Sequence, residues 1–296
     1  VIGGGPAGLT AALYLARARY RVVVVEKDHF GGQITITAEV VNFPGVERTS
    51  GAALTETMRK QAESFGAEFL LAEVTELDLS GDVKTVRTGR GDLKCFGVLL
   101  ATGAHPRELG LPGERELRGR GVSYCATCDG MFYRGKTVVV VGGGNTAVAD
   151  VLYLSRLCEK VYLVHRRDTL RASKVYLDPL QKAENVEFVW DSEVKQLLRD
   201  QAVTGVRVRN KKTGKERDIP CDGVFVAVGY LPNTELYRGQ VELDEAGYVL
   251  ADETTQTNLP GVFAVGDLRK KPLRQVVTAA SDGAVAAHFI EEYLNQ

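Results

Sequence analysis

The chain has few cysteines, no long apolar run and almost no net charge, and each absence excludes a class of protein. Five cysteines in 296 residues are too few for a secreted disulfide scaffold. The apolar run at 137–144 is far shorter than the stretch of about 20 residues that crosses a bilayer. A formal charge of −1 provides no global field that would attract nucleic acid or an anionic membrane. We therefore expect neither membrane nor nucleic-acid partners. No signal peptide is visible, and a cytoplasmic location is the default expectation.

The most informative feature is an internal repeat. The segment "VIGGGPAGLTAALYLARA" opens the chain, and "VVVVGGGNTAVADVLYLSRL" follows from Val138. Each places a β-branched run before glycines and then a helical pattern. The two copies read G-x-G-x-x-G through Gly3, Gly5 and Gly8, and G-x-G-x-x-A through Gly142, Gly144 and Ala147. In this fingerprint the first glycine makes a tight turn, the second lets the backbone approach a pyrophosphate, and the third small residue lets helix and strand pack closely. Two copies in the same context indicate two dinucleotide sites.

The residues that end the next strand in each copy differ in charge. Glu26 stands 23 residues after the first glycine of its copy, and His165 stands 23 residues after the first glycine of the other. An acid here accepts hydrogen bonds from a ribose 2′-OH and repels a 2′-phosphate. His165 is followed by Arg166, Arg167 and Arg171, whose forked guanidinium groups suit phosphate oxygens. We therefore predict NAD or FAD in the first site and NADP(H) in the second, with a solvated basic turn as the alternative for 165–171.

Two further stretches favour FAD in the first site. The segment "VLLATGA" at 98–104 and the segment "GVFAVGDL" at 261–268 each read as an apolar strand that ends in a tight turn. Asp267, directly after Gly266, could accept hydrogen bonds from the hydroxyl groups of a ribityl chain. The alternative for this aspartate is an ordinary helix N-cap.

The sequence predicts an α/β protein with two Rossmann-like dinucleotide-binding domains, the second inserted into the first. Residues 1–112 and 233–296 form the predicted FAD-binding domain. Residues 113–232 form the predicted NADPH-binding domain. Two Pro- and Gly-containing linkers, "LPGERELRGRG" and "GYLPNTELYRG", flank the insertion and suggest a hinge pair.

The stretch "SYCATCDG" places Cys125 and Cys128 three residues apart, with Asp129 directly after them. Zinc usually takes four ligands, and the other cysteines are isolated, so we expect no metal site. A structural disulfide closing so short a loop would constrain little of the unfolded chain. A redox pair fits best, because a flavin that receives a hydride from NADPH could pass two electrons to the disulfide. Asp129 would then serve as the acid, or else as a helix cap.

The chain resembles the bacterial-type, low-molecular-weight NADPH thioredoxin reductases of the class II pyridine nucleotide-disulfide oxidoreductases. The resemblance runs from residue 1 to 296 through "CATCDG", "GGGNTAVAD", "HRRDTLRA", "ATGA", "GYLPNT", "PGVFAVGD" and "RQVVTAASDGAVAA". It implies thioredoxin-disulfide reductase activity, with electrons passing from NADPH to FAD, to the cysteine pair and to a separate thioredoxin. Cys128 would face the flavin, Cys125 would attack thioredoxin, and Asp129 would be the acid. The resemblance also implies a homodimer whose two domains alternate between two arrangements.

The residues that would contact the cofactors follow from the repeat and the resemblance together. The expected FAD contacts are Gly3, Gly5, Pro6, Ala7, Gly8, Glu26, Lys27, Gly32, Gln33, Thr37, Asn42, Thr102, Gly103, Gly266, Asp267, Arg274 and Gln275. The expected NADPH contacts are Gly142, Gly144, Asn145, Thr146, His165, Arg166, Arg167 and Arg171.

Four alternatives remain open at this stage. They are the flavoprotein of a peroxide-reducing system, a small-molecule dithiol oxidase, a ferredoxin-dependent relative, and a non-catalytic flavoprotein that uses the cysteine pair as a redox sensor. The arginine cluster disfavours the first, which would prefer NADH, and the intact second glycine turn disfavours the ferredoxin-dependent one. Nucleotide preference would separate them.

Overall fold

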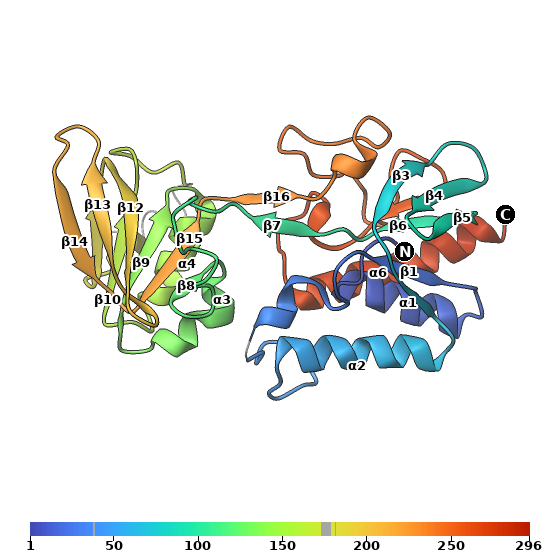
Figure 1. The fold of residues 1–296 in the computed structure, drawn as a ribbon, viewed down its shortest axis with the longest axis horizontal. Coiled ribbons are helices and arrows are strands. Elements are labelled where there is room, and N and C mark those ends of the chain that lie inside the picture. Colours follow the sequence, from blue (N-terminus) through green and yellow to red (C-terminus); the bar gives the residue numbers. More distant parts are fainter. Residues whose placement is uncertain (38, 173–178, 181) are drawn as a thin grey trace. The chain divides into compact units, whose positions relative to one another are not determined.

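The computed structural model describes residues 1–37, 39–172, 179–180 and 182–296 (Figure 1). The chain forms two compact units, one of Val1–His105 with Leu231–Gln296 and one of Pro106–Tyr230. The second unit is therefore inserted into the first, as predicted. The predicted boundaries lay a few residues further along, after 112 and 232, and the cofactor that each domain takes stays a prediction. The crossing segments β7 (Ala104–Pro106) and β16 (Tyr230–Pro232) pair as a two-stranded sheet.

The first unit is built on a parallel sheet. Its strands are β1 (Val23–Glu26), β2 (Glu68–Leu71), β6 (Val98–Leu100) and β17 (Val262–Ala264). Bridges from Ile2 to Val25 and to Leu100 join the pair β1–β2 to the pair β6–β17, so the opening residues are the central strand. An antiparallel sheet of β3 (Val74–Asp78), β4 (Lys84–Thr88) and β5 (Gly91–Cys95) is inserted between β2 and β6.

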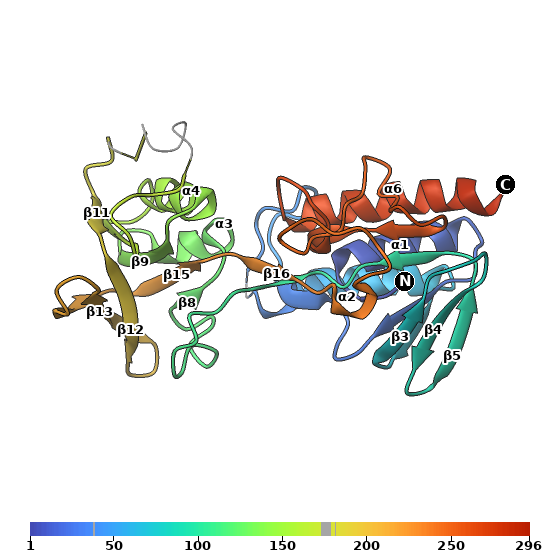
Figure 2. The ribbon, with the colours of Figure 1, turned by 90° about the horizontal axis from the view of Figure 1, so that it is seen from above.

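Alanine-rich helices pack together in this unit because their small residues permit close approach. The helices and 3₁₀ helices are α1 (Pro6–Arg17), α2 (Gly51–Ser64), α6 (Val276–Leu294), η1 (Gly32–Ile36), η3 (Glu235–Tyr237) and η4 (Gly266–Leu268). Figure 2 shows α6 running beside α1. A Cβ atom added to Gly283 of α6 would lie 2.3 Å from the carbonyl oxygen of Ala7 of α1. The buried alanines of both helices accordingly belong to one core.

The second unit repeats the plan of the first. Its parallel strands lie in the order β11 (Val186–Val189), β10 (Lys160–Val164), β9 (Thr137–Gly142), β15 (Gly223–Ala227) and β8 (Val122–Ser123). An antiparallel sheet of β12 (Ser192–Arg199), β13 (Val203–Asn210) and β14 (Glu216–Pro220) is inserted between β11 and β15 (Figure 1). The helices are α3 (Ala126–Asp129), η2 (Gly130–Tyr133) and α4 (Asn145–Leu154).

The matching strand orders position the two glycine turns. In each unit the chain builds outward from the central strand on one side and then crosses to the other side. In the first unit the strand order reverses between the opening strand and β6, and in the second it reverses between β9 and β15. Ligands of such sheets bind outside the carboxyl ends of the strands where the order reverses, and each glycine turn follows the central strand at that point. The predicted fold class, two Rossmann-like units with one inserted into the other, is confirmed.

No helix among the described residues has the length and apolar character needed to cross a membrane.

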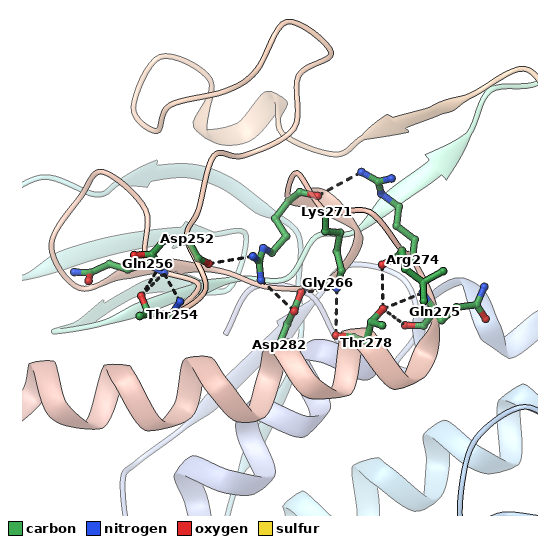
Figure 3. Close-up of polar contacts among 11 residues, drawn as sticks. Asp252, Thr254, Gln256, Gly266, Lys271, Arg274, Gln275, Thr278 and Asp282 are labelled. Atoms are coloured by element: carbon green, nitrogen blue, oxygen red, sulfur yellow. Dashed lines mark hydrogen bonds and ion pairs between the residues drawn. The ribbon is translucent and has the colours of Figure 1, made fainter. Parts of the chain in front are cut away.

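A buried ionic cluster holds the turn that begins η4 (Figure 3). Asp282 of α6 accepts hydrogen bonds from the backbone N–H of Gly266 at 2.8 Å and from Lys271 Nζ at 2.7 Å. Arg269 donates to the other carboxylate oxygen at 3.1 Å and also to the carbonyl oxygen of Asp252 at 3.0 Å. The side chains of Asp282, Arg269 and Lys271 are each about nine-tenths buried. Removing the one carboxylate would leave two cations without their countercharge in a desolvated site.

We therefore expect Asp282→Asn to lower the free energy of unfolding by about 3 kcal/mol, because it breaks a buried ionic cluster from one side. Asp218→Asn is the matched control, since Asp218 pairs with Arg207 on the exposed surface and should change stability little. Chemical denaturation of both variants measures the effect, and equal losses would contradict a special role for the buried cluster.

Burial also raises the pKa of Asp150, on α4, to about 7. At neutral pH the unfolded chain has released a proton that the folded protein still holds, so folded stability falls as pH rises towards 7. Asp150→Asn removes this effect and should raise the melting temperature more at about pH 8 than at about pH 5. The exposed Asp200→Asn is the control. A gain of the same size at both pH values would contradict the assignment.

Candidate functional site

The first glycine turn is shaped by close contacts at two of its three glycines. Gly3 has a φ of +109°, and a Cβ atom added there would lie 2.3 Å from the carbonyl oxygen of Ala101. A Cβ atom on Gly8 would lie 2.1 Å from the carbonyl oxygen of Gly3. A Cβ atom added to Gly5 would have its nearest neighbour 3.9 Å away, so the packing of the protein itself does not require a glycine there. The free space lies where α1 begins, and no side chain caps that helix.

The second glycine turn has the same design. A Cβ atom on Gly142 would lie 2.4 Å from the carbonyl oxygen of Ala227 and 2.6 Å from the Cβ of Ala147. Around Gly144 there is nothing within 4 Å, and α4 begins next to it without a side-chain cap. Asn145 and Thr146 lie exposed at that end of the helix. In both turns an open middle glycine precedes uncapped backbone N–H groups, which suits a phosphate-bearing ligand.

Glu26 is fixed against the first turn by backbone hydrogen bonds. Its Oε2 accepts from the N–H of Gly4 at 2.8 Å, and its Oε1 accepts from the N–H of Lys27 at 2.8 Å. A carboxylate has about four lone-pair sites, so capacity remains for ligand hydroxyl groups. Gly32 lies beside Gly5, where its added Cβ would come within 3.0 Å of the Gly5 Cα. The predicted contacts at 3–8, 26–27 and 32 therefore lie together, although Lys27 contributes its backbone N–H here.

The basic turn of the second unit lies directly against its glycine turn. His165 follows β10 and is only 6% exposed, and a Cβ atom on Gly143 would lie 2.1 Å from its ring. The backbone N–H of Arg171 donates to the carbonyl oxygen of Gly143 at 2.8 Å. Burial lowers the pKa of His165, and its buried Nε2 has no hydrogen-bond partner. Such an unpartnered polar atom fits a site that a ligand completes.

The three arginines of this turn are exposed, and no carboxylate pairs with them in the described part of the chain. Arg166, Arg167 and Arg171 are all exposed, whereas the neighbouring Asp168 pairs with Lys212 at 3.1 Å. The acid that interrupts the basic run is thus neutralised by a separate cation. The guanidinium groups remain able to bind a phosphate.

The turn at Gly266 lies beside the first turn of α1 and carries an unpartnered carboxylate oxygen. A Cβ atom on Gly266 would lie 3.0 Å from the Cβ of Ala7. The Oδ1 of Asp267 is buried without a hydrogen-bond partner, and burial raises the pKa of this group. Arg274 donates from Nε to the carbonyl oxygen of Asp267 at 3.3 Å. An acceptor of this kind matches the hydroxyl groups of a ribityl chain, so the residues present fit FAD.

The start of α6 brings two more predicted residues together. Gln275 is the N-cap of this helix, and its backbone N–H donates to Thr278 Oγ1 at 3.1 Å in a capping box (Figure 3). Asn42 Nδ2 donates to Gln275 Oε1 at 3.3 Å. The loop containing Asn42 is thereby connected to the helix that also carries Asp282.

Three other predicted residues use their polar groups within the protein. Gln33 Nε2 donates to the carbonyl oxygen of Ala104, next to Gly103. Thr102 Oγ1 donates to the carbonyl oxygen of Asn233 at 2.6 Å, and the carbonyl of Thr37 accepts from the N–H of Gly51 at 2.9 Å. These bonds all go to protein partners, and of the three Thr102 is placed against the first glycine turn, where its backbone nitrogen would lie 3.1 Å from a Cβ atom added to Gly3.

Cys125 and Cys128 form a disulfide, with 5.3 Å between their Cα atoms. Both are half-buried. Cys125 is the N-cap of the short helix α3, Cys128 lies within it, and Asp129 is its last residue. Burial raises the pKa of Asp129, which favours its protonated form. A Cβ atom on Gly130 would lie 2.8 Å from the ring of Tyr153, so this segment packs against α4, the helix that follows the second glycine turn. The described residues contain no cluster of three or more His, Cys, Asp or Glu side chains that could hold a metal.

Sequence reasoning missed two polar residues that shape this segment. Ser123, the last residue of β8, donates from Oγ to Asp129 Oδ2 at 2.7 Å. Glu114, only 2% exposed, accepts from Tyr124 Oη at 2.8 Å and from the N–H groups of Leu109 and Gly110, each at 2.9 Å. Ser123 stands within the quoted cysteine motif, but a lone serine there gave no signal of its partner.

Comparisons with known proteins agree with this geometry. The family model described as pyridine nucleotide-disulphide oxidoreductase matches residues 1–283. The thioredoxin reductase of Peptoclostridium acidaminophilum is 45% identical, over 99% of this chain and 96% of its own. The thioredoxin reductase of Streptomyces coelicolor is 47% identical, over 99% and 92%. The crystal structure of thioredoxin reductase from Streptococcus pyogenes has a TM-score of 0.91 at 42% identity and covers 99% of this chain and 96% of its own.

These matches extend over almost the whole chain, and they include both glycine turns and the cysteine pair. The chain belongs to the pyridine nucleotide-disulphide oxidoreductase family and, within it, to the bacterial-type thioredoxin reductases whose motifs its sequence resembles.

Proposed function

We propose that the protein is an NADPH-dependent flavoprotein disulfide reductase that reduces thioredoxin. The observation that carries the proposal is the half-buried Cys125–Cys128 disulfide, which lies in the unit that also contains the second glycine turn and the three exposed arginines of the basic turn. The names of the matching proteins supply the substrate class. The protein acts as a homodimer, in the cytoplasm, on a separate thioredoxin.

In this proposal FAD occupies the first unit, where it supplies a two-electron carrier between the nicotinamide and the disulfide. Glu26 orients the adenosine ribose and the uncapped start of α1 binds the pyrophosphate. Asp267 accepts hydrogen bonds from the ribityl hydroxyl groups. Arg274, which donates to the carbonyl oxygen of Asp267, and Gln275, the N-cap of α6, hold the segment between Asp267 and α6 in place.

NADPH occupies the second unit. The open space at Gly144 and the start of α4 receive its pyrophosphate. Arg166, Arg167 and Arg171 bind the 2′-phosphate through charge-assisted hydrogen bonds. NADH lacks this phosphate, so the same residues select against it. The intact glycine turn and the exposed arginines beside it favour a pyridine nucleotide as electron donor over ferredoxin.

The cysteine pair exchanges two electrons and two protons in each cycle. Reduction breaks the bond between Cys125 and Cys128 and gives two thiols, and Asp129 supplies a proton to Cys128. The Cys125 thiolate then attacks the disulfide of thioredoxin and forms a mixed disulfide, and Cys128 displaces the substrate by attacking Cys125. The products are the re-formed Cys125–Cys128 disulfide and a thioredoxin dithiol, whose sulfurs take up the two protons.

The purified yellow protein should reduce oxidised thioredoxin quickly with NADPH and slowly with NADH. Cys128→Ser should keep its flavin and lose thioredoxin reduction, because no intramolecular disulfide can form. The assay follows loss of NADPH absorbance and the appearance of thioredoxin thiols. NADPH that bleaches the flavin without reducing thioredoxin would rule out this partner. NADPH that leaves the flavin oxidised would rule out this electron donor.

Replacement of Arg166 and Arg167 by alanine should remove the preference for NADPH. Each charge-assisted contact with the 2′-phosphate is worth about 1.5–3 kcal/mol, so the KM for NADPH should rise at least 10-fold while the KM for NADH changes little. Flavin content should not change. Arg156→Ala is the control, because Arg156 is exposed beyond the opposite end of α4. Unaltered selectivity in the double variant would overturn the assignment of the second site.

A further inference from the structure

Ser123 joins the acid Asp129 to the backbone of the cysteine pair. It is the last residue of the edge strand β8, where it pairs with Phe225, and it is only 4% exposed. Its Oγ lies 2.7 Å from Asp129 Oδ2 and 3.3 Å from the carbonyl oxygen of Cys125. The same oxygen accepts a hydrogen bond from the N–H of Cys125 at 3.1 Å. One buried hydroxyl therefore contacts both the proton-holding group and the residue that begins α3.

The three contacts can satisfy Asp129 in either charge state. A hydroxyl has one hydrogen to donate and can accept two hydrogen bonds. When Asp129 is charged, the single hydrogen of Ser123 points to Oδ2, at the shorter of the two acceptor distances. When Asp129 carries the exchanged proton on Oδ1, the oxygen that Ser123 does not contact, the hydroxyl hydrogen can stay on Oδ2 or turn to the carbonyl oxygen of Cys125. No heavy atom has to move, and no buried polar group loses its partner.

The alternative partners of Asp129 are few in the described structure. Its site is largely buried, Arg118 acts on it only through its charge, and Tyr133 lies close enough for Asp129 to influence the titration of its hydroxyl. Among the described contacts, Ser123 donates the hydrogen bond to this carboxylate. Strand β8 fixes the position of Ser123, because β8 belongs to the five-stranded sheet rather than to the short helix that carries the disulfide.

We propose that Ser123 is a positioning residue for Asp129. Its hydroxyl rotates between Asp129 and the carbonyl oxygen of Cys125. It thereby keeps the carboxyl group of Asp129 in one orientation while Asp129 takes up and releases the proton exchanged with the cysteine pair. The inference rests on the proposed function, since it gives the acid of that function a fixed support. The described hydrogen bonds of the Ser123 hydroxyl go to Asp129 and to the backbone of Cys125.

The test compares Ser123→Ala with the wild-type protein over a range of pH. The profile of thioredoxin turnover against pH should have one limb whose midpoint depends on Asp129. Without the hydroxyl, the charged form of Asp129 loses its hydrogen-bond donor, so the midpoint of this limb should move to higher pH by about one unit. Thioredoxin turnover should fall about 10-fold near neutral pH, while electron transfer from NADPH to ferricyanide, which bypasses the disulfide, should not change. The limb is identified as the one that disappears in Asp129→Asn.

Matched variants separate positioning from general structural damage. Ser155→Ala is the control, because Ser155 also loses a hydrogen bond within the same unit, to the carbonyl oxygen of Leu152 at 3.0 Å, without touching Asp129. Ser123→Thr keeps a hydroxyl and should restore the limb. Ser123→Cys keeps the side-chain volume with a weaker donor, and it should shift the limb in the same direction as alanine even if the alanine variant folds poorly.

Two outcomes would overturn the inference. One is an unmoved limb in Ser123→Ala and Ser123→Cys. The other is a loss of turnover that is equally large in the Asp129→Asn background, since a residue that acts through Asp129 should add nothing there. Carbon-13 NMR of the oxidised protein alone can measure the carboxyl pKa of Asp129 in the wild-type protein and in Ser123→Ala. This comparison tests the inference without thioredoxin, and an equal pKa in the two proteins would also overturn it. Failure of the wild-type protein to reduce thioredoxin would therefore refute the proposed function separately.

Discussion

The structure depends on how closely a strand, a glycine turn and a helix approach one another, once in each unit. A single added methyl group would lie 2.3 Å from a backbone oxygen at Gly3 and 2.4 Å from one at Gly142. This approach directs the first backbone N–H groups of α1 and α4 into the open space at Gly5 and Gly144. Uncapped N–H groups are a cost when they meet no acceptor, and they become a binding site when they meet an anion. The same steric constraint therefore fixes the packing of each unit and shapes each turn that we propose to bind a phosphate.

The two units share a plan, and charge at the end of one strand distinguishes them. In the first unit, Glu26 is held by backbone N–H groups and presents acceptors to a hydroxyl-bearing ligand. In the second, buried His165 packs on Gly143 and the following arginines stay exposed. Strand order, inserted antiparallel sheet and turn geometry match in both. A duplicated fold can therefore take two related nucleotides, because selectivity lies in a few side chains after the second strand.

The sequence predicted what is local and repeated. The glycine spacing identified both turns, the β-branched runs identified the central strands, and the interval of 23 residues found Glu26 and His165. Contacts between residues far apart in the chain were not predictable. Nothing near Asp282 in the sequence indicates that it binds Lys271 and the N–H of Gly266, and nothing near Thr102 indicates that Asn233 takes its hydrogen bond. Such pairs depend on tertiary packing, which carries no periodic pattern, and the same holds for Ser123, whose partner depends on where β8 ends.

The pairing of the two crossing segments has a consequence for how such a protein can arise. Near the ends of the inserted unit, the N–H of Arg107 donates to the carbonyl oxygen of Gly229 at 2.9 Å, and in the host unit the N–H of Asn233 donates to the carbonyl oxygen of Gly103 at 2.9 Å. Chain ends that lie side by side are the condition under which one domain can be inserted into another without disturbing either fold. Here the host presents adjacent exit and entry points, and the guest presents adjacent termini. The inserted unit is thus a module that gene fusion could exchange for another of the same build, leaving the host sheet intact.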